Sequence, residues 1–233
     1  MRTQKLLTYL IVTVVSMLFA SQIIFAVPKL PDYELLQEKY ESQETQEQVD
    51  TGFKDVEAGS WYADAVKFVT EKEIMVGTPD GLFNPYDEVS RGMFISVLYR
   101  ITDNKVADTK TTFSDLDEEK YYFDPVTWGY ARGIIDGSST DKFEPNEAIS
   151  REQLISFLYR FERYDSYLNV DIEFNEEIEK FSDFDDISEY AVKPMKWAYT
   201  KGLIQGRDDN TLAPKSSVTR AEAAIIVLRY MNQ

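Results

Sequence analysis

Three arginines occupy one position of a pattern that occurs three times along the chain. Arg91, Arg151 and Arg220 each directly follow a serine or threonine that opens an apolar run with helical spacing. A cation at the first position of a helix opposes the positive end of the helix dipole, at a cost of roughly 0.3–1 kcal/mol. A guanidinium group beside the free N–H groups of a helix start suits a carboxylate or a phosphate. The position therefore predicts an anion-binding site.

The repeated arginine has a second interpretation, which is an internal ion pair. Each unit opens with a phrase that contains an aspartate: FKDV with Asp55, FSDL with Asp115 and FSDF with Asp183. Pairing between these acids and the arginines explains the pattern equally well. Both interpretations hold together if the aspartate orients the arginine toward a ligand, so the three aspartates are also candidate binding residues.

The composition excludes several kinds of catalytic and metal site. The 233 residues include no histidine and no cysteine, so no Ser-His-Asp triad, catalytic cysteine–histidine pair, thiolate or imidazole zinc site, or disulfide is available. The aspartate-rich stretches at 114–119, 182–186 and 207–210 do not match a calcium-binding loop. Carboxylate pairs, Ser-Lys pairs and oxygen-ligated metals are the enzyme chemistries that remain. A glycosidase would need paired carboxylates, but no acid pair stands apart from the repeat pattern. We expect no enzyme, cofactor or metal.

The formal charge of −16 argues against nucleic acid as a partner.

The spacing of glycine, proline and arginine defines the repeat. The glycine ends an apolar segment at Gly77, Gly137 and Gly206, and each arginine follows its glycine by fourteen residues. A proline lies between them each time, at Pro85, Pro145 and Pro214. A period of 60 to 70 residues that occurs three times indicates that the copies fold together, since a helical pair of about 50 residues cannot bury its apolar surface alone.

Each unit is predicted to form two helices joined by a loop. Before each glycine, apolar residues recur at i, i+4, i+7 and i+8, which indicates a buried helical stripe. The stripe consists of Trp61, Ala65, Phe68 and Val69 in the first unit; Tyr121, Pro125, Trp128 and Gly129 in the second; and Tyr190, Pro194, Trp197 and Ala198 in the third. The two prolines of the stripe are expected in a first helical turn. Tyr62 and Tyr122, beside the stripe, are weak candidates for exposed sugar-stacking rings, and Phe83, Phe143 and Leu212 are expected to fill the core of each unit.

The second helix of each unit is predicted to begin after Ser90, Ser150 or Thr219, which are good N-cap residues. Gln153 and Glu222 stand three residues after their caps and complete a capping box, whereas Met93 in the first unit is expected to lack the reaching side chain.

The segments outside the repeats are polar or strongly apolar. Residues 1–26 carry a positive start and an uncharged apolar run, which indicates a cleaved signal peptide or an uncleaved membrane anchor. Residues 27–52 are predicted to be an acidic linker. The units span 53–101, 113–161 and 181–233, with a long acidic connector over 162–180.

The combination of these motifs resembles three S-layer homology (SLH) repeats over roughly residues 53–233. The resemblance rests on the F-x-D phrases, the segments at 128–137 and 197–206, F/L-x-P, and the TRAE of Thr219–Glu222. It implies an all-α, pseudo-threefold helical body with one helix of each repeat at the centre. It also implies that grooves between repeats bind a secondary cell wall polymer linked to peptidoglycan, commonly one with pyruvate ketals. The binding role would fall on Arg91, Arg151 and Arg220, with Glu222 as the one acid retained in the TRAE position.

The function expected from this resemblance is noncatalytic attachment to the cell wall of a Gram-positive bacterium after export. The alternative is a degenerate SLH body that has lost glycan binding and serves as a membrane-tethered structural or protein-docking module. Any contact with a membrane is expected only through an uncleaved N-terminal segment.

Overall fold

The computed structural model describes residues 49–103, 105, 111–136, 141–165 and 172–233. The expected signal or anchor at 1–26, and all of the acidic linker except its last four residues, lie outside the described residues. Among the described residues no helix has the length and apolar composition to cross a bilayer.

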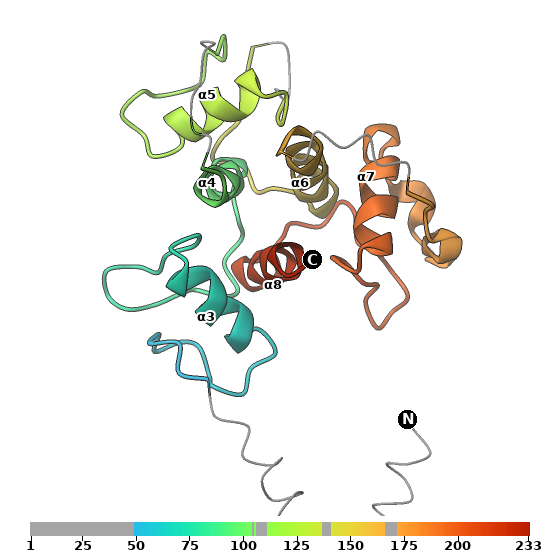
Figure 1. Cartoon of the computed structure of the whole chain (residues 1–233), viewed down its shortest axis with the longest axis horizontal. Coiled ribbons are helices and arrows are strands. Elements are labelled where there is room, and N and C mark those ends of the chain that lie inside the picture. Colours follow the sequence, from blue (N-terminus) through green and yellow to red (C-terminus); the bar gives the residue numbers. More distant parts are fainter. Residues whose placement is uncertain (1–48, 104, 106–110, 137–140, 166–171) are drawn as a thin grey trace, which may run out of the picture. The chain divides into compact units, whose positions relative to one another are not determined.

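Each repeat contributes one outer and one inner helix (Figure 1). The outer helices are α3 (Ala63–Glu71), α5 (Phe123–Ala131) and α7 (Glu189–Thr200); the inner helices are α4 (Arg91–Ile101), α6 (Arg151–Asp165) and α8 (Arg220–Met231). Two short 3-10 helices, η1 (Glu176–Lys180) and η2 (Phe184–Asp186), precede α7. In the described parts the only extended pairing is three isolated bridges, so the predicted all-α class is confirmed.

The inner helices begin at the predicted caps. The hydroxyls of Ser90, Ser150 and Thr219 each accept a hydrogen bond from the backbone N–H three residues on. In the first repeat the prediction of a missing capping box was wrong, because the Ser90 N–H lies 3.4 Å from the sulfur of Met93. A thioether is only a weak acceptor, so this box is the weakest of the three.

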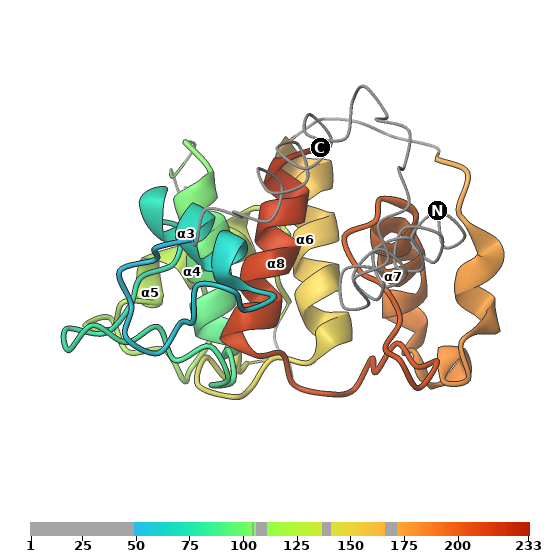
Figure 2. The ribbon, with the colours of Figure 1, turned by 90° about the horizontal axis from the view of Figure 1, so that it is seen from below.

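Helix packing runs between repeats. The outer helix α5 packs against α4 of the preceding repeat, and α7 packs against α6 in the same way. The circle is completed by α3 of the first repeat, which packs against α8 of the last. In Figure 1, which looks along the inner helices, α4, α6 and α8 lie at the centre with the outer helices around them, and Figure 2 shows the inner helices from the side.

A ring of backbone hydrogen bonds joins the segments that lead into the inner helices. The Val89 N–H donates to Val218, the Ile149 N–H donates to Val89, and the Val218 N–H donates to Ile149. All three side chains are buried. Each repeat therefore supplies one donor and one acceptor to a ring that closes only when all three are present.

In the first and third repeats, the glycine that ends the apolar segment makes room for the opening phenylalanine. A Cβ atom on Gly77 would lie 2.1 Å from the ring of Phe53, and one on Gly206 would lie 1.8 Å from the ring of Phe181. The predicted core residues Phe83, Phe143 and Leu212 lie nearby and are fully buried (relative exposure 0%).

The start of the outer-helix stripe was predicted in the wrong register. Trp61 and Tyr121 are 62% and 58% exposed, whereas the next residues, Tyr62 and Tyr122, are 4% exposed. The helical spacing does not extend back to these positions because α3 and α5 begin only at Ala63 and Phe123. The later stripe residues are packed as predicted, with Trp128 and Trp197 in the core.

The third repeat departs from the other two at its outer helix. Pro125 lies in the first turn of α5 as predicted, but Pro194 lies inside α7, because that helix begins one turn earlier at Glu189. A proline there cannot donate to the carbonyl four residues back. The end of the expected acidic connector also packs onto this helix, since Ile178 of η1 is fully buried and Lys196 of α7 binds both Glu176 and Glu179.

Candidate functional site

Each repeated arginine reaches into the next repeat and binds its backbone carbonyls. Arg220 donates from Nε to the Phe83 carbonyl and from a terminal nitrogen to the Val76 carbonyl, both at 2.7 Å. Arg91 makes the corresponding bonds to Phe143 at 2.8 Å and Asp136 at 3.4 Å. These bonds link adjacent repeats and give the arginine a structural role that compensates for its disfavoured position at the helix start.

The N–H groups at the helix starts are not free, contrary to the sequence-based expectation. The backbone N–H groups of Arg220 and Ala221 donate to the backbone carbonyls of Asp87 and Pro85 in the first repeat. The next N–H of the helix start, that of Glu222, donates to the Thr219 hydroxyl. The starts of α4 and α6 are satisfied in the same way. A ligand in this region therefore meets side chains rather than an open helix end.

The repeated aspartates hold loops within their own repeats. Asp55 accepts the backbone N–H groups of Phe83 and Asn84 at 2.8 and 2.6 Å. Asp115 and Asp183 hold the equivalent loops with the same two-oxygen geometry. No ion pair within the described ranges joins these aspartates to Arg91, Arg151 or Arg220. At Phe83 and at Phe143 an aspartate and an arginine instead act on the same loop, the aspartate on its N–H groups and the arginine on a carbonyl.

The three arginines differ in exposure. Arg91 and Arg151 are 5% and 8% exposed, whereas Arg220 is only half-buried. Burial lowers the pKa of each of the three, although an arginine remains charged at neutral pH. Among the described residues the Arg151 side chain makes one hydrogen bond, to the Gln205 carbonyl at 3.3 Å, and its buried Nε has no partner there.

A pocket of about 450 Å³ opens beside Arg220, and all three repeats contribute to it. The first repeat supplies residues 75–78 and one side of α4, the second supplies Tyr121, and the third supplies Arg220 and Ala223. Two cations, Arg220 and Arg100, line the same space. Of the seven residues that the sequence singled out as candidates, the pocket contains Arg220 alone.

The acids at this pocket are Asp87 and Glu88, which sequence analysis did not identify. Both are exposed, and a Glu88 oxygen accepts a hydrogen bond from the Ser217 hydroxyl. The pocket thus combines guanidinium groups that bind a carboxylate with carboxylates that accept hydrogen bonds from hydroxyl groups. This mixture suits a ligand that carries both an acid and several hydroxyls, such as an acidic sugar.

Glu222, the remaining candidate, lies outside this pocket. One of its oxygens accepts the Thr219 N–H at 2.9 Å and completes the capping box, while the other lies 3.6 Å from Arg207. Its charge also raises the pKa of the buried Arg151, although burial has the larger and opposite effect. Glu222 therefore acts electrostatically on Arg151.

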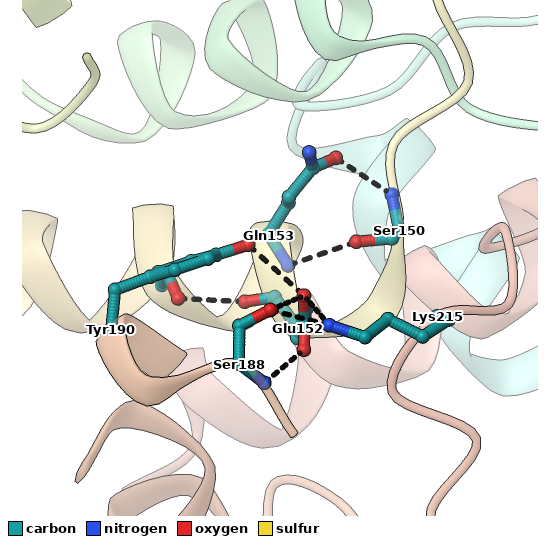
Figure 3. Close-up of polar contacts among 7 residues, drawn as sticks. Ser150, Glu152, Gln153, Ser188, Tyr190 and Lys215 are labelled. Atoms are coloured by element: carbon teal, nitrogen blue, oxygen red, sulfur yellow. Dashed lines mark hydrogen bonds and ion pairs between the residues drawn. The ribbon is translucent and has the colours of Figure 1, made fainter. Parts of the chain in front are cut away.

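A buried carboxylate network joins the second and third repeats (Figure 3). The side chain of Glu152 accepts bonds from the Ser188 N–H and hydroxyl, from the Tyr190 hydroxyl and from the Lys215 ammonium, at 2.6 to 3.1 Å. Burial acts to raise the pKa of Glu152, but the bonds from Lys215 and Ser188 outweigh it and hold the pKa below its usual value. Burial of the Tyr190 hydroxyl and the charge of Glu152 raise the pKa of Tyr190 to about 12.

Sequence analysis missed this network, although the alignment of the repeats contains a signal for it. Gly92 and Ala221 occupy the position of Glu152 in the other repeats. The facing position, which holds a buried tyrosine in the first two repeats, is Ala191 in the third. The third repeat thus has a smaller residue, Ala191, where it faces the larger residue Glu152 of the second repeat.

The described residues contain no group of three or more acids placed to hold a metal ion. Asp115 and Asp183, which belong to two of the aspartate-rich stretches, direct both carboxylate oxygens to backbone N–H groups.

Comparison with known proteins identifies the repeats. The profile of the S-layer homology domain matches three segments, 52–93, 112–155 and 180–224, which together make up more than half of the chain. An endoglucanase of Bacillus sp. (strain KSM-635) is 30% identical over 75% of this chain and 18% of its own length. The S-layer protein sap of Bacillus anthracis is 26% identical over 78% of this chain and 21% of its own length.

A cellulosome-anchoring protein of Acetivibrio thermocellus is 31% identical over 46% of this chain and 25% of its own length. The chain spans only 10% to 18% of the length of the first three relatives, so what is shared is a module of those longer proteins. The three matched segments contain the three arginines and the outer helices α3, α5 and α7, and each segment ends inside the inner helix that its arginine begins. The chain belongs to the S-layer homology family.

Proposed function

We propose that the chain is an exported, noncatalytic module that attaches to an anionic polymer of the bacterial cell wall. Membership of the S-layer homology family supports attachment at the cell surface. The names of two relatives, an S-layer protein and a cellulosome-anchoring protein, refer to a surface layer and to anchoring. The wall of a Gram-positive bacterium is the location that this proposal assigns.

The observation that carries the proposal is the pocket at Arg220. Two carbonyl bonds fix the guanidinium in place before a ligand arrives, so the ligand does not have to order that side chain. A guanidinium has five N–H donors, and these bonds use two of them. The remaining donors bind a carboxylate of the polymer, such as that of a pyruvate ketal on a sugar.

The net charge of the chain does not prevent this contact. The formal charge of −16 repels a polyanion at long range. At physiological ionic strength, however, charges separated by more than about 8 Å are largely screened. A carboxylate that reaches the Arg220 pocket interacts with the arginines at hydrogen-bond distance, where screening is weak. Local charge therefore decides whether binding occurs.

The proposal is tested by co-sedimentation of the full chain with purified Gram-positive cell walls, before and after removal of their acidic polymer. We expect binding only to the intact walls, and weaker binding for Arg220→Ala. Arg91→Ala is the matched control, because it loses the same kind of carbonyl bonds between repeats but does not line the pocket. Circular dichroism and Tm establish that both variants are folded. Unchanged binding by folded Arg220→Ala contradicts the proposed site.

The alternative function, a degenerate body without glycan binding, makes the opposite prediction in the same experiment. It expects no difference between intact and stripped walls. It also expects an N-terminus that is still attached to residues 1–26, which mass measurement of the protein from cells detects.

A further inference from the structure

The inner helices carry a second repeated arginine near their C-terminal ends, at Arg100, Arg160 and Arg229. In the first and third repeats this side chain donates to a backbone carbonyl of its own repeat. The Arg100 bond to Ile74 is 3.0 Å long, and the equivalent Arg229 bond to Leu203 is 3.1 Å long. In the second repeat the same terminal nitrogen of Arg160 lies 2.6 Å from a carboxylate oxygen of Asp136.

The partner of Arg160 comes from a position that varies among the repeats. The residue directly before the repeat glycine is Val76, Asp136 or Gln205. Val76 is 54% exposed and lines the pocket together with Arg100 and Arg220. A valine side chain accepts no hydrogen bond, so this position leaves the second arginine of the first repeat without the acid that Asp136 supplies in the second.

The other acids around the pocket do not form ion pairs with its arginines. Asp87 and Glu88 lie on its lining, yet among the described residues no salt bridge joins either one to Arg100 or Arg220. Burial lowers the pKa of Arg220 most, the charges of Asp87 and Asp55 oppose this, and the nearby Arg100 lowers it further. Two cations that repel one another across a pocket are both stabilised by an anion between them.

Around Arg151, the residue of the second repeat that corresponds to Arg220, the acid stands at a different position. Gln205 is neutral there, but Glu222 occupies the place that Met93 holds in the Arg220 pocket. Thus the surroundings of Arg91 and Arg151 each contain a carboxylate, Asp136 or Glu222, at one of two positions that are apolar in the Arg220 pocket.

We propose that Arg100 is a second ligand-binding residue of the Arg220 pocket, and that the side chain before the repeat glycine determines whether this arginine is available. Val76 leaves Arg100 available to a sugar carboxylate, and Asp136 occupies Arg160. This inference rests on the proposed function and specifies its ligand as a sugar acid whose charge is shared by two guanidinium groups.

The experiment exchanges the residues that precede the repeat glycine in the first and second repeats. Val76→Asp gives Arg100 the partner that Arg160 has, and Asp136→Val removes that partner from Arg160. Both side chains are exposed, so neither change disturbs the core. Binding of the full chain to cell walls is measured by co-sedimentation, and by calorimetry with a methyl hexoside that carries a 4,6-pyruvate ketal. The methyl ester of this sugar is the uncharged control.

We expect Val76→Asp to weaken binding roughly tenfold, because loss of one charge-assisted contact costs about 1.4 kcal/mol or more. Arg100→Ala is expected to weaken binding similarly, whereas Arg229→Ala, which loses an equivalent carbonyl bond outside the pocket, is expected to bind like wild type. Asp136→Val is expected to bind at least as tightly as wild type.

The outcomes separate this inference from the proposed function. If the wild-type chain binds neither walls nor the acidic sugar, both are wrong. If wild type binds and Val76→Asp binds equally well, only the role of Val76 and Arg100 is wrong. An equal loss of binding affinity in Arg100→Ala and Arg229→Ala overturns the inference as well, because it shows that the loss comes from the missing carbonyl bond and not from the pocket.

Discussion

Asp55 and Arg220 hold the same residue, Phe83, from two different repeats. Asp55 accepts the Phe83 N–H within the first repeat, while Arg220 of the third repeat donates to the Phe83 carbonyl. The loop that lines the Arg220 pocket is therefore fixed by both the acid and the arginine of the repeat pattern. Stability and ligand binding use the same side chains here.

Replacement of Asp55 by alanine is expected to destabilise the protein by about 1–3 kcal/mol, because the N–H groups of Phe83 and Asn84 lose their acceptor. Urea unfolding followed by circular dichroism measures the change. Asp208→Ala, at an exposed position, is the control and should stay within about 0.5 kcal/mol of wild type. An equal effect of the two substitutions would show that the loop does not depend on Asp55.

The Glu152 network is expected to make stability depend on pH. The folded protein holds the pKa of Glu152 below its usual value, so the folded state favours the charged carboxylate. Its contribution is fully present above the unfolded pKa, about 4.3, and is lost as the pH falls through the lower, folded pKa.

Unfolding of wild type and Glu152→Gln should therefore differ most near neutral pH and converge in acid. The exposed Glu147→Gln serves as the control, for which we expect a small difference that changes little with pH. A constant gap between wild type and Glu152→Gln down to pH 2 would contradict a charged Glu152.

Gly206→Ala is expected to destabilise the protein by about 1–3 kcal/mol, since the new methyl group overlaps the ring of Phe181. Thermal unfolding measures this effect. Gly59→Ala is matched in chemistry, but its Cβ meets no atom within 4 Å, so it should be nearly neutral. Similar melting temperatures for the two variants would show that Phe181 moves away at little cost.

Glu73→Gly is expected to stabilise the protein. Glu73 has a φ of 56°, in the left-handed region where Gly133 and Gly202 stand in the other repeats. A residue with a Cβ is disfavoured there by about 1–2 kcal/mol, part of which the greater flexibility of glycine in the unfolded chain offsets. We expect a rise in Tm of about 2 °C. The neighbouring Lys72→Gly, at a negative φ, should lower Tm instead.

Local features of the fold were predictable because they depend on nearby residues. The caps at Ser90, Ser150 and Thr219 were identified from the serine or threonine and the apolar run that follows. The core positions Phe83, Phe143 and Leu212 were identified from their place between glycine and proline. Both features repeat three times, which distinguishes them from chance.

The contacts between repeats were not predictable from residue patterns. The three copies share one pattern, so the sequence does not show whether an arginine binds within its own repeat or in the next. Arg220 binds carbonyls of the first repeat, more than 130 residues away in the chain. Backbone carbonyls are present at every residue and carry no sequence signal, so the partners considered for the arginines were an external anion and the repeated aspartates.

The circular packing of the helices separates the order of synthesis from the order of assembly. Among the described helices, the first outer helix, α3, packs on α8, which follows all the others in the chain. An incomplete chain thus has no surface on which α3 can settle, and its apolar side stays exposed until residues 220–231 have emerged. Closure of the circle of helices therefore requires residues 63–71 and 220–231 to be present together.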